Sequence, residues 1–139
     1  MKKFPSIVLA TPALASACAS NSGLSRSEEK LTQYEPYVGE PVSSFTAFRQ
    51  QSWEPISRTQ LVLWTSINDA WLLTVANNCP SMMFTNAVSV TSTTSSISTL
   101  DHVIVKGDRC PITQIQPIDV RRMRDDRNAR KAEAAARNN

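Results

Sequence analysis

The sequence predicts a mainly β protein: a small antiparallel meander, curved sheet or barrel with one disulfide, flanked by a flexible N-terminal tether and a basic C-terminal helix. Two observations support this prediction. Short apolar segments rich in β-branched and aromatic residues recur about every ten residues between polar turns, which is typical of antiparallel strands. Two late cysteines, Cys79 and Cys110, can join across a sheet whose core is modest for a chain of this length.

Residues 1–17 have the pattern of a signal peptide. Lys2 and Lys3 precede about eight apolar residues, and small residues follow. This apolar stretch is too short to cross a membrane as a helix, which needs about 20 residues. We therefore expect the protein to be exported to the periplasm.

Cys18 follows directly and has two interpretations. The segment from Leu14 to Cys18 resembles a bacterial lipobox, although Ala15 stands where that pattern prefers leucine. In this interpretation Cys18 carries a lipid, and Ala19 after it favours the outer membrane. Residues 15–17 also fit ordinary signal peptidase, which would release a soluble product. A retained anchor or a cytosolic start is a third interpretation.

Residues 18–44 are predicted to form the flexible tether. The segment is polar, contains two prolines and shows no sustained hydrophobic periodicity. One exception is Leu31, Tyr34 and Tyr37, whose spacing of three could form a short amphipathic turn.

Residues 45–119 are predicted to form the β-rich domain. Asn68 and Asp69 separate the first two strands as a hairpin turn, and residues 106–109 form another tight turn. Residues 81–86 could form a short helical turn, and residues 92–96 read as a polar connection. The expected strands cover residues 60–65, 70–75, 87–91, 102–106 and 110–118.

Cys79 and Cys110 are expected to form a disulfide once Cys18 is cleaved off or lipidated. Closing a loop of about 30 residues would contribute about 3 to 4 kcal/mol. Two unrelated buried thiols are the alternative. Two cysteines and one histidine, without a CxxC pattern, fall short of a structural zinc site, and no nucleotide-binding motif is present. We expect no metal and no cofactor.

Several motifs of this domain together resemble a family of small exported Gram-negative proteins known only as a domain of unknown function. The resemblance covers about residues 45–119, and it implies the domain boundaries and the cysteine pair but no catalytic residue. It rests on Trp53, Leu61–Thr65, Ala70-Trp-Leu-Leu73, Cys79-Pro80, Leu100-Asp-His-Val-Ile-Val105, Arg109-Cys-Pro-Ile112 and Ile115.

Asp101 and His102 are the candidate polar site. Adjacent strand residues point to opposite faces, so Asp101 is badly placed to orient His102 as a catalytic base. Asp101 is better explained as a tie between the Ser/Thr-rich loop and its strand. Paired carboxylates for acid–base chemistry would have to come from Glu54, Asp69, Asp101, Asp108 and Asp119. We assign no catalytic residue.

Trp64 and Trp71, together with Trp53, are the candidate ligand-stacking residues. Packing in the core is the competing interpretation, because Trp64 and Trp71 lie inside apolar strands. An exposed pair of tryptophans would favour a carbohydrate or peptide ligand.

Residues 120–139 are predicted to be a basic helical or disordered tail with Asp119 as the N-cap. From Val120 onward the chain has seven basic and three acidic residues. A solvated helix is one interpretation, and attraction to anionic lipid headgroups, lipopolysaccharide or an acidic protein is the other. Nucleic acid is not an expected partner, because the tail lacks interleaved aromatic residues.

These features favour a non-enzymatic function. We expect an exported, lipid-anchored envelope protein that acts as a binding or structural module for a protein, peptide or cell-wall component. One alternative is a small periplasmic hydrolase with a carboxylate site near Asp101. Another is an enzyme inhibitor that inserts residues 92–98 into its target.

Overall fold

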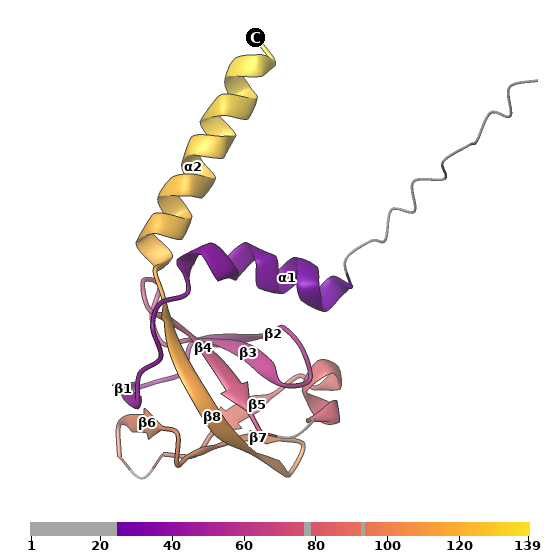
Figure 1. The fold of residues 1–139 in the computed structure, drawn as a ribbon, viewed down its shortest axis with the longest axis vertical. Coiled ribbons are helices and arrows are strands. Elements are labelled where there is room, and N and C mark those ends of the chain that lie inside the picture. Colours follow the sequence, from indigo (N-terminus) through magenta and orange to yellow (C-terminus); the bar gives the residue numbers. More distant parts are fainter. Residues whose placement is uncertain (1–24, 77–78, 93) are drawn as a thin grey trace, which may run out of the picture.

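The computed structural model describes residues 25–76, 79–92 and 94–139. The expected signal peptide and Cys18 lie outside the described residues. The predicted fold class is confirmed: the protein is mainly β, with an antiparallel sheet, one disulfide and a C-terminal helix (Figure 1). Its elements are α1 (Arg26–Tyr34), the 3-10 helix η1 (Glu35–Tyr37), β1 (Ser44–Thr46), β2 (Ser52–Pro55), β3 (Gln60–Trp64), β4 (Ala70–Val75), the 3-10 helix η2 (Pro80–Phe84), β5 (Val88–Val90), β6 (Ser96–Ser98), β7 (His102–Val105), β8 (Asp108–Ile118) and α2 (Val120–Arg137).

Both predicted hairpins are present in the six-stranded sheet. β3 pairs with β4, so that Leu61 lies opposite Leu73. β7 pairs with β8 around a two-residue turn, in which Lys106 and Gly107 both have positive φ, 51° and 88°. Turns of this hand match the natural twist of the two strands they join.

The strand order is β2-β3-β4-β8-β7-β5, which differs from a simple meander at its centre. A meander would place β5 beside β4, but β8 takes that position. The first part of β8 pairs with β7 and its later part pairs with β4, and the register shifts between Thr74 and Val75. One long strand therefore joins the two halves of the sheet and lets it curl (Figure 1).

A small second sheet contributes to the same core as the six-stranded sheet, through Phe45 and Ile97. β1 pairs with β6, with Phe45 opposite Ile97. β6 begins at Ser96, which is the last residue of the segment 92–96 that was expected to be a polar connection. It is short and carries serines on either side of a single apolar residue, so its sequence has little strand character.

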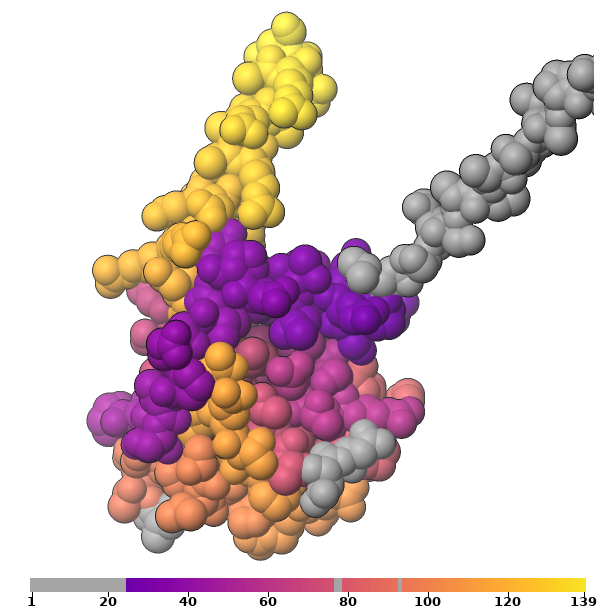
Figure 2. Space-filling model, viewed as in Figure 1, coloured from indigo at the N-terminus to yellow at the C-terminus, as the bar shows by residue number. Residues whose placement is uncertain are grey.

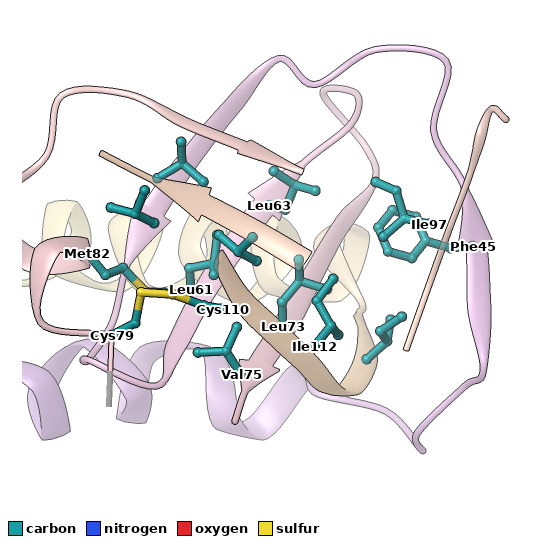
Figure 3. Close-up of a cluster of buried hydrophobic side chains, with 14 residues drawn as sticks. Phe45, Leu61, Leu63, Leu73, Val75, Cys79, Met82, Ile97, Cys110 and Ile112 are labelled. Atoms are coloured by element: carbon teal, nitrogen blue, oxygen red, sulfur yellow. A yellow bond between two sulfur atoms is a disulfide. The ribbon is translucent and has the colours of Figure 1, made fainter. Parts of the chain in front are cut away.

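The sheet buries apolar side chains on both faces. The inner core, shown in Figure 3, includes Leu61, Leu63 and Leu73 and lies within the curled sheet. The outer cluster lies on the opposite face, where Val62 and Leu72 pack beneath α1, η1 and the start of α2. β3 alternates between the two, so three successive residues of this strand are fully buried. This explains its continuous apolar sequence.

The structure differs from the expected flexible tether over residues 25–44. Ser25 begins α1 with a capping box, in which its hydroxyl accepts from the Glu28 N–H and the Glu28 carboxylate accepts from the Ser25 N–H. Val38 and Val42 then form bridges to β8. Tyr34 and Tyr37 are buried. The three-residue spacing from Leu31 thus marks an element that packs against the sheet.

The predicted disulfide is confirmed. Cys79 and Cys110 are bonded, with their Cα atoms 6.3 Å apart and a sequence separation of 31. Both are buried in the inner core beside Met82 (Figure 3). The bond joins the start of η2 to β8, and the interpretation of two unrelated thiols is wrong.

Candidate binding groove between the helices

The two helices meet over the outer cluster. Asp119 caps α2 as predicted, because its carboxylate accepts from the Arg122 N–H at 3.0 Å. The Asp119 N–H donates to the Tyr37 carbonyl at 2.8 Å, which joins the start of α2 to η1. Val120 and Met123 are buried, whereas every residue from Arg127 to the C-terminus is exposed. α2 therefore projects from the body after its first turns (Figures 1 and 2).

A groove of about 330 Å³ lies between α1, η1 and α2. Buried aromatic and apolar side chains form part of its wall, and two basic residues of α2 stand at its side. Its lining residues are Gln33, Tyr34, Tyr37, Met123, Arg127 and Arg130.

Tyr37 links the groove to α2 through its hydroxyl. This hydroxyl donates to Asp126 Oδ2 at 2.9 Å and accepts from Arg130 Nη2 at 3.2 Å. The Arg122 guanidinium lies 5.7 Å from the centre of the Tyr37 ring. The hydrogen bond to Asp126, aided by burial, raises the pKa of Tyr37. Asp126 and Arg130 are therefore bridged by a tyrosine.

Tyr34 anchors α1 to the edge of the sheet. Its hydroxyl donates to Glu54 Oε2 at 2.5 Å, and Lys30 Nζ lies 3.4 Å from the other oxygen of Glu54. Lys30 also donates to the Pro55 carbonyl at 3.1 Å. Burial, followed by the hydrogen bond to Glu54, raises the pKa of Tyr34. These contacts hold the α1 wall of the groove on β2.

Replacing Tyr34 with phenylalanine is expected to lower the free energy of unfolding by about 1 to 2 kcal/mol at neutral pH, because the Glu54 carboxylate loses a hydrogen bond. Folding raises the pKa of Tyr34 above the unfolded-state value of about 10. The stabilisation by Tyr34 is therefore complete below about pH 10, and it decreases as the pH rises above that value. Urea unfolding at neutral pH and at about pH 11 measures both effects. The stability gap between wild type and variant should narrow at the higher pH; an unchanged gap would show that Tyr34 titrates normally.

Arg127 and Arg130 stand three residues apart on α2 and so lie on the same side of the helix. Within residues 25–76, 79–92 and 94–139, the single ion pair is that of Lys30 with Glu54. Arg127 makes no hydrogen bond to the described residues, and Arg130 uses one donor for Tyr37. The groove thus presents two guanidinium groups whose charges no described carboxylate pairs directly.

Asp101 has the structural role expected of it. Its Oδ2 accepts from the Ser98 N–H at 2.8 Å and from the Ser98 hydroxyl at 3.0 Å, and its Oδ1 accepts from Thr91 at 3.4 Å. These bonds tie β6 and the end of β5 to the start of β7. His102 is half-buried, and its backbone N–H donates to the Thr91 hydroxyl at 2.8 Å. Among the described residues, the side-chain groups that donate to Asp101 are the hydroxyls of Ser98 and Thr91.

The candidate tryptophans do not form one surface. Trp71 packs on the inner core and stacks on Phe45 with ring centres 4.3 Å apart. Trp64 packs on the outer cluster, at the opposite face of the sheet, and Trp53 joins the inner core. Core packing accounts for all three, and Trp64 and Trp71 lie on opposite faces of the sheet and so cannot stack on one ligand.

Asp69 and Asp108 each accept a hydrogen bond from a serine hydroxyl. The hydroxyl of Ser66 donates to Asp69 in the β3–β4 turn, and the hydroxyl of Ser81 donates to Asp108 at 3.1 Å. In the part of the chain that the structure describes, histidine, cysteine, aspartate and glutamate side chains form no cluster of three suited to a metal ion.

The groove was not predicted from the sequence. Its two walls come from segments that were assigned to a tether and to a tail, about 90 residues apart in the chain. The spacing of Leu31, Tyr34 and Tyr37 was the available indication, because an aromatic stripe on a short helix needs a covering partner. Nothing in the α2 sequence indicates which of its arginines face that stripe.

Comparison with known protein families shows that residues 1–134 match the model of one family, whose function is unknown. The match extends beyond the residues on which the resemblance rested. Searches of curated proteins and of solved structures found no match. Among the described residues, no helix combines the length and apolar character needed to cross a membrane.

Proposed function

This chain belongs to the family of unknown function DUF6491, and we propose that it is an exported, lipid-anchored binding module of the cell envelope without enzymatic activity. The observation that carries the proposal is the groove between α1 and α2. It offers two arginines without a described carboxylate partner, set against two buried tyrosines. Such a site is suited to an acidic partner, and the candidates are envelope proteins, peptides and cell-wall components.

Export and lipidation are the parts of the proposal that rest on the sequence. The buried disulfide is consistent with an oxidising compartment such as the periplasm. Cys18 precedes Ser25, the cap of α1, by seven residues, which span at most about 25 Å when extended. A lipid on Cys18 would therefore keep α1 and the groove close to the membrane surface.

The described contacts give less support to the two alternatives. A hydrolase at Asp101 would need a second titratable group beside it, whereas the side chains bonded to Asp101 are those of Ser98 and Thr91. An inhibitor loop at residues 92–98 would need to protrude, whereas residues 96–98 pair with β1.

Lipidation is tested by growing Gram-negative cells that express the full chain with labelled palmitate. The wild-type protein should carry the label and fractionate with the membrane, and Cys18→Ser should lose both properties. Cys79→Ser is the matched control, because it removes a cysteine that the proposal does not lipidate. Cleavage after Ala17 without label would establish ordinary signal processing and overturn the anchor.

Binding at the groove is tested in intact cells with a photo-crosslinking residue at Gln33, which lines the groove. The same residue at Asn128, on the exposed part of α2, is the control. We expect an envelope component to be captured from position 33, and capture should fail in the Arg127→Gln/Arg130→Gln variant. Equal capture from both positions, or none from position 33, would contradict a binding role for the groove.

A further inference from the structure

We propose that the group recognised in this groove is a phosphate, held by Arg127 and Arg130. The inference rests on the proposed binding function but not on the lipid anchor. It begins with the number of donors. Each guanidinium has five N–H donors, and among the described residues Arg127 uses none of them and Arg130 uses one, toward the Tyr37 hydroxyl at 3.2 Å. More donors therefore remain than a single carboxylate can accept.

Phosphate fits this donor set better than a carboxylate does. The oxygens of a phosphate are arranged as a tetrahedron, and they are numerous enough to accept hydrogen bonds from two guanidinium groups at once. A phosphate can also carry more than one negative charge. The spacing of three residues places the two arginines about one helical turn apart on one side of α2. Both are exposed, so their planes can turn toward a ligand in the groove.

The charges around the site favour an anion. The carboxylates bonded to the groove's two tyrosines are both engaged: Asp126 accepts from the Tyr37 hydroxyl, and Glu54 accepts from Tyr34 and pairs with Lys30. Arg122 adds a third guanidinium over the Tyr37 ring. The charges of these named groups therefore sum to a positive value, which favours an anion over a cation.

Tyr37 acts as a positioning residue. Its hydroxyl is held by Asp126 at 2.9 Å and in turn accepts from Arg130, so the hydroxyl orients that guanidinium without needing to touch the ligand. The Asp119 N–H holds the Tyr37 backbone carbonyl at 2.8 Å. The groove is thus built before a ligand arrives, which reduces the entropy lost on binding.

A second depression, of about 340 Å³, lies beside the disulfide and provides a comparison. It contains one arginine, Arg109, and the carboxylate of Asp108 stands in the same wall. An anion there would meet repulsion as well as attraction. The groove beside α2 is therefore the better phosphate site.

The test uses the purified full chain and two probes. Inorganic phosphate is titrated calorimetrically, and vesicles of phosphatidylglycerol in phosphatidylcholine are compared with vesicles of phosphatidylcholine alone in a sedimentation assay. Arg127→Gln/Arg130→Gln should lose about tenfold or more in affinity. The matched control is Arg121→Gln/Lys131→Gln, which removes the same charge from residues outside the groove lining and should lose about threefold or less. Tyr37→Phe should show an intermediate loss.

The outcomes distinguish the sources of the phosphate. Competition between the two probes supports a membrane headgroup, and binding of inorganic phosphate without vesicle binding supports a soluble phosphate compound. Equal losses in the two double variants would show a diffuse attraction to α2 and overturn the inference. So would tighter binding of polyglutamate than of either phosphate probe. If position 33 captures an envelope component in cells while neither phosphate probe binds, the phosphate inference fails and the proposed binding function stands.

Discussion

Replacing Cys79 with serine is expected to lower the free energy of unfolding by about 3 to 4 kcal/mol. The disulfide closes a loop with a sequence separation of 31, so its loss releases conformational entropy in the unfolded chain. The two sulfurs are also buried in the inner core, where an unpaired hydroxyl would be poorly accommodated. Urea unfolding under non-reducing conditions measures the difference.

Three comparisons make this result specific to the disulfide. Cys110→Ser should be destabilised to a similar degree, and the double variant should be much less destabilised than the sum of the two, because both changes remove one bond. Reductant should destabilise the wild type and leave the Cys79→Ser variant unchanged. A loss below about 1 kcal/mol in the single variants would show that the bond contributes little to stability.

Truncating Leu73 to alanine is expected to cost about 2 to 5 kcal/mol. Leu73 is 0 % exposed and lies on β4, the strand that joins the β3 hairpin to β8. Its neighbours across the sheet are Leu61 and Ile115, and both belong to the inner core. The change would leave a cavity among packed side chains that cannot fully collapse. Thermal and urea unfolding both measure the loss.

Leu100→Ala is the matched control, since it removes the same atoms from a side chain that is 88 % exposed. Its expected effect is within about 0.5 kcal/mol. Equal destabilisation of the two variants would mean that the buried Leu73 side chain contributes no more to the free energy of unfolding than the exposed Leu100 side chain does.

Local chemistry in the sequence predicted the local elements. The Asn68-Asp69 turn separates β3 from β4, and Lys106-Gly107 closes the β7–β8 hairpin, because such residues favour turn conformations whatever surrounds them. The disulfide followed from counting cysteines in a chain that was expected to be exported. Asp119 could be assigned as a helix cap because its carboxylate needs only its own neighbours in sequence.

The features that were missed all depend on contacts between distant parts of the chain. The pairing of β4 with β8 depends on packing against both faces of the sheet, and no short segment of the sequence indicates this packing. α1 is a short helix with a polar sequence, and tertiary contacts through Tyr34 and Tyr37 hold it in place. The groove combines both effects, since neither of its walls exists without the fold.

The direct junction between β8 and α2 has a mechanical consequence. Asp119 alone separates the strand from the helix, so tension applied to the projecting end of α2 would pass into the central strand of the sheet. That strand would detach from β4 hydrogen bond by hydrogen bond until the load reached Cys110, where a covalent link to Cys79 would stop further extraction. The disulfide would thus resist a partner that pulls on α2, and a reductant would remove this resistance.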